Sequence, residues 1–385
     1  MNIVELCTGY PPDRTGGAEQ VVSCIRDGLV PRGHRVRIVT RYWGTRVPGP
    51  DITQIRTPKS EFRGYAGWTV QAVRTVSHIR PDLIHCHGLE GALVCIFTSN
   101  KRFPRMMHLH NSLSRERGYL KSITHIIGLC VLMLAIMRAD LVVVPTQVVR
   151  EDVFRHLGRT NRNKIIVLPN PVAQSESIPT EEFSRLKREL NANHRKVILY
   201  FGKVKRTKGL EDICKAYEMM QRKNEARLVV AGAPTATDTF LQQLKREYED
   251  VVFTGFVPDP APFYQVADLF CIYTTGFEGG ETFGVALVDA MLNKVPIVCS
   301  DNPIFREVTG GNAMFAPPQN PGALASAFDK ALSDLRPLAL RAERAYEFAT
   351  REYTQEIVSE RLEKIYRRLI ASRESFSADS PGASK

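Results

Sequence analysis

Short runs of β-branched and other apolar residues recur along the chain, separated by helical patterns and loops. In the first half they span Ile3–Leu6, Val36–Thr40, Leu83–Cys86, Met106–Leu109, Leu141–Val144 and Ile165–Leu168. In the second half they span Val197–Phe201, Leu228–Ala231, Val251–Thr254, Leu269–Tyr273 and Ile297–Cys299. Most of these runs do not alternate polar with apolar residues, which is typical of strands buried on both faces of a parallel sheet. Strands that alternate with helices predict an α/β fold of the doubly wound kind.

The order of these runs also predicts how the chain divides into domains. The series restarts near Val197, after a polar stretch from Ala173 to His194. The small, polar residues at the end of the chain cannot bury an apolar face, so we expect them to be disordered. We therefore expect two similar domains, at 1–172 and 173–350. A helix at 351–371 and a disordered tail at 372–385 would follow them.

The composition is that of an ordinary folded protein, because 43% of the residues are hydrophobic and 24% are charged. A disordered or fibrous chain is therefore excluded. The longest apolar run, Ile126–Met137, is shorter than the roughly 20 residues that a membrane-spanning helix needs. The first residues lack a signal-peptide pattern, and the eight cysteines are scattered without zinc-like spacing. These features favour a cytoplasmic protein with reduced thiols.

Residues that follow the predicted strands are the candidates for a site, because ligands of open α/β sheets bind beyond the carboxyl ends of the strands. After the first strand, Gly16 and Gly17 lead into an apolar-periodic helix. Glycines let the backbone approach a phosphate closely at a helix amino terminus. The pair therefore indicates a ligand-facing loop, with a plain turn as the alternative. It is not Gly-x-Gly-x-x-Gly, which argues against a dinucleotide cofactor and a dehydrogenase.

A second candidate follows the predicted strand at Val197–Phe201. The segment from Gly202 to Gly209 has four cations within six residues, and a helical pattern follows it. Cations at a helix amino terminus oppose the helix dipole unless an anion is bound. A diphosphate held by Lys203 and Lys208 would remove this conflict. The alternative is a solvated basic loop, and a P-loop is excluded because its motif is absent.

The segment Thr274–Met291 is the most informative one. A Gly-rich turn with Glu278 and Glu281 precedes a helical pattern that contains Asp289. On one helix Glu281 and Asp289 would lie about 12 Å apart, at 1.5 Å per residue, too far for the paired carboxylates of a glycosidase. Their spacing suits two ends of an extended ligand, such as the sugar and the ribose of a nucleotide-sugar. A merely solvated Asp289 is disfavoured because its neighbours are apolar.

Together these motifs resemble those of the retaining GT-B glycosyltransferases of family four. The run from Glu281 to Asp289 is similar to the Glu-x7-Glu region of that family. Gly202-Lys203 followed by Lys208-Gly209 resembles its diphosphate loop, and Gly16-Gly17 resembles its amino-terminal glycine loop. Further resemblances, in chain order, are Pro81–His87, His108–Asn111, Ala139–Thr146 and Leu168–Pro171. The resemblance covers nearly the whole chain.

The resemblance implies a fold and an activity. Two Rossmann-like domains would face a cleft, the first taking the acceptor and the second the nucleotide-sugar, and the helix at 351–371 would pack back on the first. The enzyme would move a sugar from a nucleotide-diphosphate sugar to a hydroxyl acceptor with retained anomeric configuration. No metal and no other cofactor is expected, since the chain lacks the Asp-x-Asp motif usual in metal-dependent glycosyltransferases. A sugar-nucleotide epimerase and a non-catalytic nucleotide-sugar-binding protein are the alternatives with this fold.

Roles for individual residues follow from the same resemblance. Glu281 would hold the sugar hydroxyls and Asp289 the ribose, in place of the usual Glu. Lys203, in place of the usual Arg, gives a point charge where the family has a bidentate fork. The groups expected to stabilise the leaving diphosphate are Lys203, Lys208 and helix N–H groups near Phe283 and Gly284.

The histidines differ in what they indicate. His110 matches a family histidine that faces the donor sugar, so we assign it to the catalytic site. For His85 and His87, which end a buried strand, a structural role is favoured over acid–base chemistry, and a metal site formed with His110 is disfavoured.

Two features bear on the acceptor. Residues 1–172 have 24 basic and 12 acidic residues, so the net charge of +11 lies entirely in the first domain. Because the diphosphate loop lies outside it, this excess predicts an anionic membrane face or an anionic, lipid-phosphate acceptor of glycan biosynthesis, and disfavours nucleic acid. The apolar run Ile126–Met137, preceded by Arg115, Arg117 and Lys121, predicts a buried helix, with membrane contact as the alternative.

Overall fold

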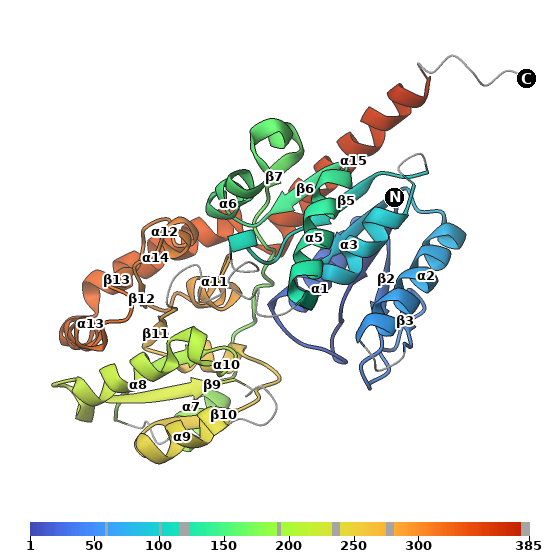
Figure 1. Ribbon diagram of the computed structural model, residues 1–385. Coiled ribbons are helices and arrows are strands. Elements are labelled where there is room, and N and C mark those ends of the chain that lie inside the picture. Colours follow the sequence, from blue (N-terminus) through green and yellow to red (C-terminus); the bar gives the residue numbers. More distant parts are fainter. Residues whose placement is uncertain are drawn as a thin grey trace, which may run out of the picture. The chain divides into compact units, whose positions relative to one another are not determined.

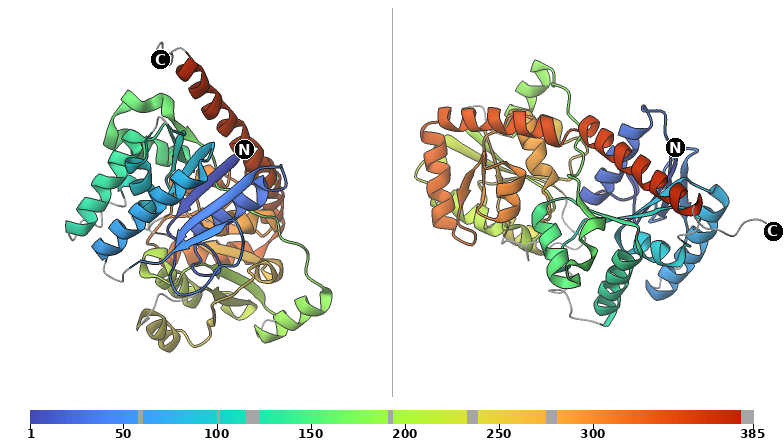
Figure 2. Two further views of the ribbon diagram at one scale, coloured as in Figure 1. Left: turned by 90° about the vertical axis from the view of Figure 1, so that its right-hand side faces the viewer. Right: turned by 90° about the horizontal axis from the view of Figure 1, so that it is seen from above.

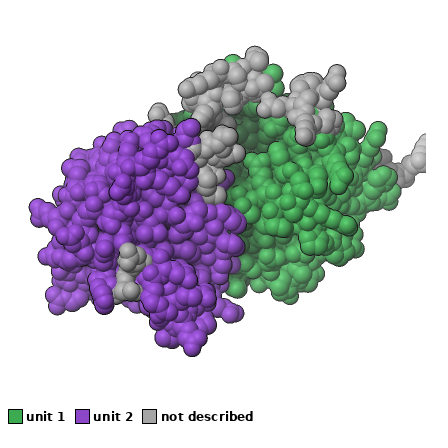
Figure 3. All heavy atoms as spheres, turned by 90° about the horizontal axis from the view of Figure 1, so that it is seen from below, with its two compact units in different colours: residues 1–171, 355–385 green, residues 172–354 purple. Residues whose placement is uncertain are grey.

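Two parallel sheets organise the chain, each in its own compact unit (Figure 3). The computed structural model describes residues 1–57, 61–99, 102–114, 123–190, 194–232, 239–274 and 281–378. Unit 1 consists of residues 1–171 and 355–385, and unit 2 consists of residues 172–354. The chain thus leaves unit 1 once and returns to it with its last helix.

The sheet of unit 1 has the strand order β3-β2-β1-β4-β5-β6-β7, and every neighbouring pair is parallel (Figure 1). The strands are β1 Asn2–Cys7, β2 Arg35–Arg41, β3 Ile52–Ile55, β4 Leu83–His87, β5 Arg105–His108, β6 Leu141–Val144 and β7 Ile165–Val167. The central strands β1, β4 and β5 are buried along almost their whole length, although polar and ionisable residues such as Glu5 and His85 interrupt their apolar sequences.

Helices cover this sheet and connect its strands. They are α1 Gly17–Leu29, α2 Glu61–Ile79, α3 Gly88–Phe97, α5 Ile123–Arg138, α6 Gln147–Leu157, the 3₁₀ turn η1 Arg159–Lys164, and α15 Gln355–Ala378. Helix α15 runs beside α1 (Figure 2). The two approach closely at Gly28, where a Cβ atom would lie 2.0 Å from the hydroxyl of Ser359.

The sheet of unit 2 has the strand order β10-β9-β8-β11-β12-β13 and is also parallel. Its strands are β8 Lys196–Phe201, β9 Ala226–Ala231, β10 Val252–Gly255, β11 Leu269–Ile272, β12 Ile297–Ser300 and β13 Met314–Ala316. Its helices are α7 Thr180–Glu189, η2 Arg206–Lys208, α8 Leu210–Met219, η3 Lys223–Glu225, α9 Thr239–Glu247, α10 Ala261–Val266, α11 Val285–Leu292, α12 Pro303–Val308, α13 Pro321–Ser333 and α14 Arg336–Glu352.

Several helices begin at residues whose side chains satisfy the first free N–H groups. The side chain of Thr146 accepts a hydrogen bond from Val149 N at the start of α6, and Asn302 accepts one from Phe305 N at the start of α12. Asn320 does the same for α13, and a proline follows both asparagines at the first helical position. These local signals fix where the helices begin relative to the strands that precede them.

The architecture confirms the predicted α/β fold with two doubly wound parallel sheets, and each predicted apolar run coincides with a strand. Two edge strands, β3 and β13, were not predicted, because β3 has two polar residues between its two isoleucines and β13 is a short run that no further β-branched residue extends. The last helix also differs from the prediction. Helix α15 continues to Ala378, so 372–378 is helical rather than disordered, and 379–385 lies outside the described residues.

Helix α5 corrects the prediction that the run Ile126–Met137 is buried. Ala135 and Ile136 are buried, but the residues that share the opposite face are exposed. At spacings of three and four residues they form a continuous stripe, the α5 apolar stripe, made of Ile126, Ile127, Cys130, Leu134 and Met137. The preceding cations Arg115, Arg117 and Lys121 lie outside the described residues. Among the described residues, no helix is long and apolar enough to cross a membrane.

Candidate active site

The basic loop of unit 2 follows strand β8, as the sequence predicts. Lys203 is exposed, and its carbonyl accepts a hydrogen bond from the hydroxyl of Tyr200. Lys208 is the last residue of η2, and its Nζ forms an ion pair with the carboxylate of Glu281. Both side chains are 18% exposed. The fold therefore brings together a cation and a carboxylate that are 73 residues apart in sequence. Both residues were predicted from the sequence to bind the same nucleotide-sugar.

Gly209 explains how this loop is held against the sheet. Its φ of +66° is in the left-handed region, and a Cβ atom there would lie only 1.6 Å from the carbonyl oxygen of Tyr273, just beyond the end of β11. A residue with a side chain would push the loop away from the strand. Glycine at this position therefore allows the loop with Lys208 to lie close to the edge of the sheet. Gly202, at the start of the loop, has a φ of +152°.

The helix that follows Glu281 begins later than the sequence spacing assumed. Helix α11 starts at Val285 with Gly284 as its N-cap, so Glu281 precedes the helix and the 12 Å separation inferred for a single helix does not apply. The Phe283 side chain is buried edge-on against Tyr353, with ring centroids 5.2 Å apart. Its ring is therefore part of the core, and only backbone groups around Phe283 and Gly284 are placed to meet a ligand. Glu278 lies outside the described residues.

Asp289 lies on α11 and has an unusual proton affinity. Burial raises its pKa from 3.8 to about 7, so near neutral pH the carboxyl group is balanced between its two forms. A ligand hydroxyl that donates a hydrogen bond to the carboxylate would stabilise the ionised form. This is the behaviour expected of a binding group that is desolvated before its ligand arrives.

In unit 1, strand register gathers a carboxylate and several imidazoles at the carboxyl end of the sheet. Glu5 on β1 is opposite His85 on β4, and His87 on β4 is opposite His108 on β5. Side chains two apart on a strand share a face, so His85 and His87 point the same way. His110, just after β5, adds a further ring stacked on His108 with centroids 4.5 Å apart.

Short contacts connect these groups in a chain. His87 Nδ1 and His110 Nε2 are 2.9 Å apart, and His87 Nε2 lies 2.6 Å from Oε2 of Glu5. The other carboxylate oxygen of Glu5 accepts a hydrogen bond from the hydroxyl of Tyr366 on α15 at 3.1 Å. That hydroxyl is also 2.7 Å from Nδ1 of His85. Glu5, His85 and Tyr366 are completely buried.

Burial and mutual interaction set the charges in this cluster. Burial alone would raise the pKa of Glu5, but His85 and the hydrogen bond from His87 outweigh it and lower the pKa to about 2. Burial lowers the pKa of His87 to about 4, with a further contribution from His85. Burial, with the neighbouring imidazoles, lowers the pKa of His110 well below 6.5. At neutral pH an ionised Glu5 therefore faces neutral His87 and His110 rings.

The three imidazoles of His85, His87 and His108 were considered as metal ligands. One nitrogen of each ring lies within 4.8 Å of those of the other two, and tetrahedral zinc with bonds of 2.0–2.1 Å would bring its ligand nitrogens to about 3.3 Å from one another. The rings of His85 and His108 are stacked with an interplanar angle of 10°, so their lone pairs do not converge. Both nitrogens of His87 are already engaged. His87 belongs to the hydrogen-bonded chain with Glu5 and His110, whereas Nε2 of His85 and both ring nitrogens of His108 are buried without a hydrogen-bond partner among the described residues.

The loop with Gly16 and Gly17 follows β1 and leads into α1. Gly16 has an extended backbone and Gly17 has open space where a Cβ would be, so neither requires glycine for its conformation. Beside the loop, the guanidinium groups of Arg14 and Arg41 lie 4.7 and 4.8 Å from the ring centroid of Trp43, which is 45% exposed. Trp43 is fixed because its Nε1 donates a hydrogen bond to the carbonyl of Thr8 at 2.8 Å.

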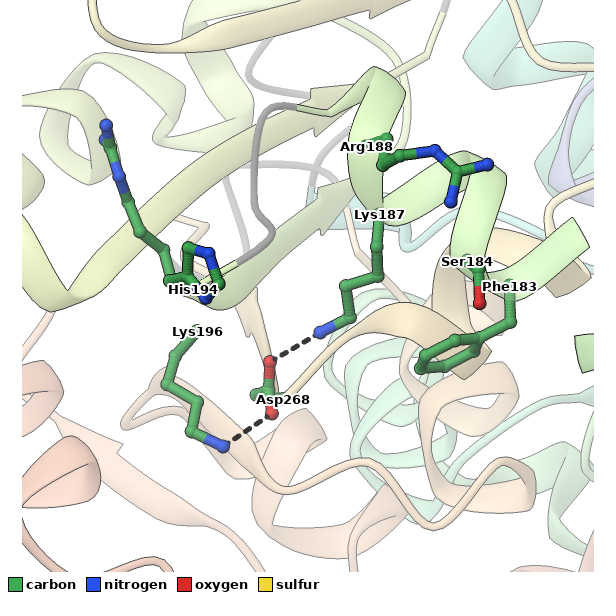
Figure 4. A pocket seen from close by; sticks show the side chains of 8 residues that line it. Phe183, Ser184, Lys187, Arg188, His194, Lys196 and Asp268 are labelled. Atoms are coloured by element: carbon green, nitrogen blue, oxygen red, sulfur yellow. Dashed lines mark hydrogen bonds and ion pairs between the residues drawn. The ribbon is translucent and has the colours of Figure 1, made fainter. Parts of the chain in front are cut away.

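A separate groove in unit 2 lies at the other ends of the strands. Figure 4 shows Lys187 and Lys196 both directed at Asp268, each at 3.1 Å from one carboxylate oxygen. The remaining lining residues are Phe183, Ser184, Arg188, His194 and Arg195. Because Lys196 begins β8 and Asp268 precedes β11, this groove is at the amino ends of the strands, away from the predicted site residues.

Fold and site define a two-domain α/β protein of the GT-B kind. The family described as Glycosyltransferase Family 4 matches residues 15–176, and the family described as Glycosyl transferases group 1 matches residues 195–334. The chain belongs to the group 1 glycosyltransferases and is therefore a transferase of sugars.

Individual proteins agree with this assignment. The chain is 24% identical to an uncharacterised glycosyltransferase of Methanocaldococcus jannaschii, over 87% of this chain and 90% of the relative. It is 28% identical to the phosphatidyl-myo-inositol mannosyltransferase of Mycobacterium tuberculosis over 46% of this chain and 48% of the relative. The crystal structure of Anabaena HepE in complex with UDP and glucose has a TM-score of 0.79 at 20% identity, covering 96% of this chain and all of that one.

Several residues of the site region were not predicted from the sequence. Glu5 has a recognisable signal, because it is a carboxylate within the apolar strand Asn2–Cys7, and such a charge needs a partner when buried. Tyr366 has none, since it is 361 residues away from Glu5 and is recruited by the return of α15. Arg41 ends β2 two residues before Trp43, whereas Arg14 comes from the loop after β1, and a single sequence does not indicate that these segments meet.

Proposed function

We propose that this glycosyltransferase moves a sugar from a nucleotide-diphosphate sugar to a hydroxyl acceptor, with retention of anomeric configuration and without a metal ion. The observation that supports this most directly is the pairing of Lys208 with Glu281 at the loop after β8. A cation for the diphosphate and a carboxylate for the sugar hydroxyls lie side by side there. The complex of Anabaena HepE with UDP and glucose, a protein of the same fold, supports a donor of this class.

The leaving diphosphate presents the main electrostatic problem of this reaction. As the glycosidic bond breaks, negative charge develops on the phosphate oxygens while the sugar becomes oxocarbenium-like. Lys203, Lys208 and the free N–H groups at the start of α11 would stabilise that charge in the place of a metal ion. Glu281 would orient the sugar and Asp289 the ribose. The acceptor proton would pass to an oxygen of the leaving phosphate, so that no separate base is needed.

The acceptor is proposed to be anionic and bound by unit 1. Arg14 and Arg41 lie over Trp43 beside the loop after β1, and Arg14, whose side chain is 43% exposed and also pairs with Glu19, is the cation at the surface there. The net charge of residues 1–172 supports the same conclusion. The relative that acts on phosphatidyl-myo-inositol by its name makes a lipid-linked acceptor a specific possibility to test.

Peripheral binding to the inner face of a membrane is part of this proposal. The α5 apolar stripe exposes Ile127 and Met137, each 52% accessible, on one face of a single helix. An exposed apolar helix face can enter the interface of a bilayer while nearby cations meet anionic headgroups.

A donor screen tests the proposed reaction. The purified protein is incubated with UDP-, GDP- and ADP-sugars, with and without a lipid extract and with and without EDTA. A glycosylated product whose yield is insensitive to EDTA is expected. A changed donor without any acceptor product would indicate an epimerase, binding without turnover a non-catalytic protein, and loss of activity in EDTA a metal-dependent reaction.

Variants then test the residues. Lys208→Ala and Glu281→Gln are each expected to lower kcat by about 100-fold or more, the usual effect of removing one group that stabilises transition-state charge. Lys215→Ala removes an exposed lysine of α8 that pairs with Glu211 and serves as the matched control. Full activity of both site variants would refute the assigned roles.

A further inference from the structure

The groove at the amino ends of the unit 2 strands, here called the basic groove, has an excess of positive charge that the proposed reaction does not use. Its cations are Lys187, Arg188, Arg195 and Lys196. Asp268 is the one acid among the described residues that line it, so four cations and one acid give a formal charge of +3 with histidine counted as neutral. Residues 172–354, which form unit 2, include 22 Lys or Arg and 24 Asp or Glu, a net charge of −2. The groove therefore concentrates cations in a unit that is otherwise slightly acidic.

Asp268 holds two of these cations in place. Its Oδ2 accepts a hydrogen bond from the backbone N–H of Val197 at 2.9 Å, which fixes the carboxylate beside the start of β8. Lys187 and Lys196 each donate to this carboxylate at 3.1 Å, and Figure 4 shows them approaching it from different sides. An ammonium group has three N–H donors, so the bond to Asp268 occupies one donor of each lysine. The carboxylate thus orients two ammonium groups that have further hydrogen bonds to offer.

The stability of helix α7 accounts for only part of this charge. Lys187 and Arg188 lie in the last turn of α7, where cations interact favourably with the helix dipole. Arg195 and Lys196 are not on a helix but at the start of β8, and Arg195 pairs with Asp250 at 3.5 Å. Two separate segments therefore direct cations into one hollow, where like charges repel each other unless an anion lies between them.

We propose that the basic groove binds a small phosphate monoester, at a site separate from the loop with Lys203 and Lys208. The planar fork of a guanidinium matches the oxygens of a phosphate, and Arg188 is exposed at this groove. The volume of the groove, about 640 Å³, is in the range of sites for small organic ligands. Phe183, which is 37% exposed, adds an apolar wall, and Nζ of Lys187 lies 5.7 Å from its ring centroid. The ligand thus carries an organic part that packs on Phe183 beside its phosphate.

The depth of the charges favours a free small molecule over an anionic membrane. The side chains of Lys187 and Asp268 are 20% and 19% exposed, whereas that of Lys196 is 51% exposed. A flat bilayer surface would meet only the exposed cations, while a ligand inside the hollow also reaches Lys187. The basic groove and the loop after β8 lie at opposite ends of that strand, so a ligand in the groove leaves the proposed donor loop open.

Phenyl phosphate is a suitable probe because it combines a phosphate monoester with an aromatic ring. It is titrated into the full-length protein while amide NMR spectra are recorded, which reports the site residue by residue. Saturable shifts of the Lys196 and Asp268 amides are expected, with a dissociation constant of about 1 mM or lower. Phenol and inorganic phosphate, which each offer half of these contacts, are expected to bind at least about tenfold more weakly. Shifts confined to residues 202–209, or no saturable shift, would overturn the proposal.

Variants of exposed side chains test which residues bind the probe. Arg188→Gln combined with Lys196→Gln is expected to weaken phenyl phosphate binding by about tenfold or more, because two charged donors are lost. Arg185→Gln is the matched control, since it removes one charge from the same helix at a side chain that pairs with Glu182 and Glu189, and it should bind the probe as tightly as the unmodified protein.

The same spectra show whether the variants are folded. Equal affinities of the double variant and the unmodified protein would refute the assignment of the groove residues. Flotation with vesicles that contain phosphatidic acid, without binding of phenyl phosphate, would identify a membrane contact in place of the proposed ligand. A negative donor screen would count against the proposed transferase reaction and would leave the result for the basic groove unchanged.

Discussion

At the scale of single residues, Asp289, the proposed ribose ligand, shows how burial alters a carboxyl group. Its carboxyl group has a pKa of about 7 because it is desolvated, so part of it is neutral in the absence of ligand. A ribose hydroxyl favours the ionised form, since a carboxylate is a stronger acceptor than a carboxylic acid. Binding and ionisation of Asp289 are therefore coupled.

This coupling predicts a pH dependence of donor affinity. Below pH 7 the dissociation constant is expected to rise by up to about tenfold per pH unit, because a proton must first be removed from Asp289. Asp289→Asn should bind more weakly above pH 7 and show no such dependence. Titration calorimetry at pH 6, 7 and 8 with a nucleotide-sugar checks this, and a dependence that persists in Asp289→Asn would assign it to another group.

The same shift has the opposite effect on folding. Because the pKa in the folded state lies above the ordinary 3.8, the folded protein binds the proton more tightly, and stability is lost as the pH rises from about 4 to 7, with the full cost remaining above pH 7. Asp289→Asn is accordingly expected to raise the free energy of unfolding at pH 8. The ionised form of Asp289 is thus expected to strengthen donor binding but to lower the free energy of unfolding.

Gly209 is a residue whose importance depends on the backbone alone. Gly209→Ala is expected to lower the free energy of unfolding by about 1–3 kcal/mol, because the new Cβ atom would collide with the carbonyl of Tyr273 and φ is positive. Gly17→Ala is the matched control, since a Cβ there has open space. Urea denaturation of the two variants checks the difference, and equal stabilities would contradict the tight approach at Gly209.

At the scale of elements, helix α5 combines two environments. One face packs in the core through Ala135 and Ile136, while the α5 apolar stripe is exposed along the other. The sequence is apolar all round, so periodicity does not separate the two faces. Only the position of the helix on the sheet does so, which is why the prediction of a buried helix was wrong.

The stripe predicts a measurable membrane affinity. Ile127→Gln combined with Leu134→Gln is expected to reduce flotation with vesicles of phosphatidylcholine and phosphatidylglycerol by about tenfold, because two apolar side chains no longer enter the interface. Val70→Gln is the matched control, as Val70 is 51% exposed on α2. Flotation insensitive to the stripe, to salt and to anionic lipid would rule out peripheral binding through this surface.

At the scale of the whole molecule, the buried histidines make the stability of the fold depend on pH. His87, with a pKa of about 4, and His108 and His110, with pKa values well below 6.5, stay neutral when folded because burial disfavours their charge. In the unfolded chain they take up protons near pH 6.5. Below that pH the unfolded state therefore binds more protons than the folded state.

Stability is accordingly expected to fall as the pH drops from 6.5 towards 4.5. Each such histidine contributes about 1.4 kcal/mol per pH unit in this window, and Asp289, which is protonated only in the folded state over the same window, offsets one histidine's share. Denaturant titrations at pH 7, 6 and 5 check the slope, and His87→Gln is expected to reduce it by one histidine's share. A free energy of unfolding that is constant over this range would show that the imidazoles are not held neutral.

The sequence was most informative where local chemistry is decisive. Buried strands such as Leu141–Val144 were predictable from their apolar runs, and so was the position of the basic loop with Lys203 and Lys208 directly after a strand. The start of α11 was not, since its N-cap Gly284 follows a glycine-rich turn that does not reveal where the helix begins. The contact between Tyr366 and Glu5 could not be predicted from the sequence, because it depends on helix α15 folding back onto unit 1.

The ion pair between Lys208 and Glu281 has a consequence for what the proposed donor site rejects. A free monosaccharide offers hydroxyls to Glu281 but separates it from Lys208, which then has no anion. A nucleoside diphosphate without sugar satisfies Lys208 but leaves Glu281 without a partner. Only the intact donor compensates both charges at once, so the pair makes the two halves of the nucleotide-sugar bind cooperatively. We therefore expect a free monosaccharide and a nucleoside diphosphate each to inhibit the enzyme only weakly.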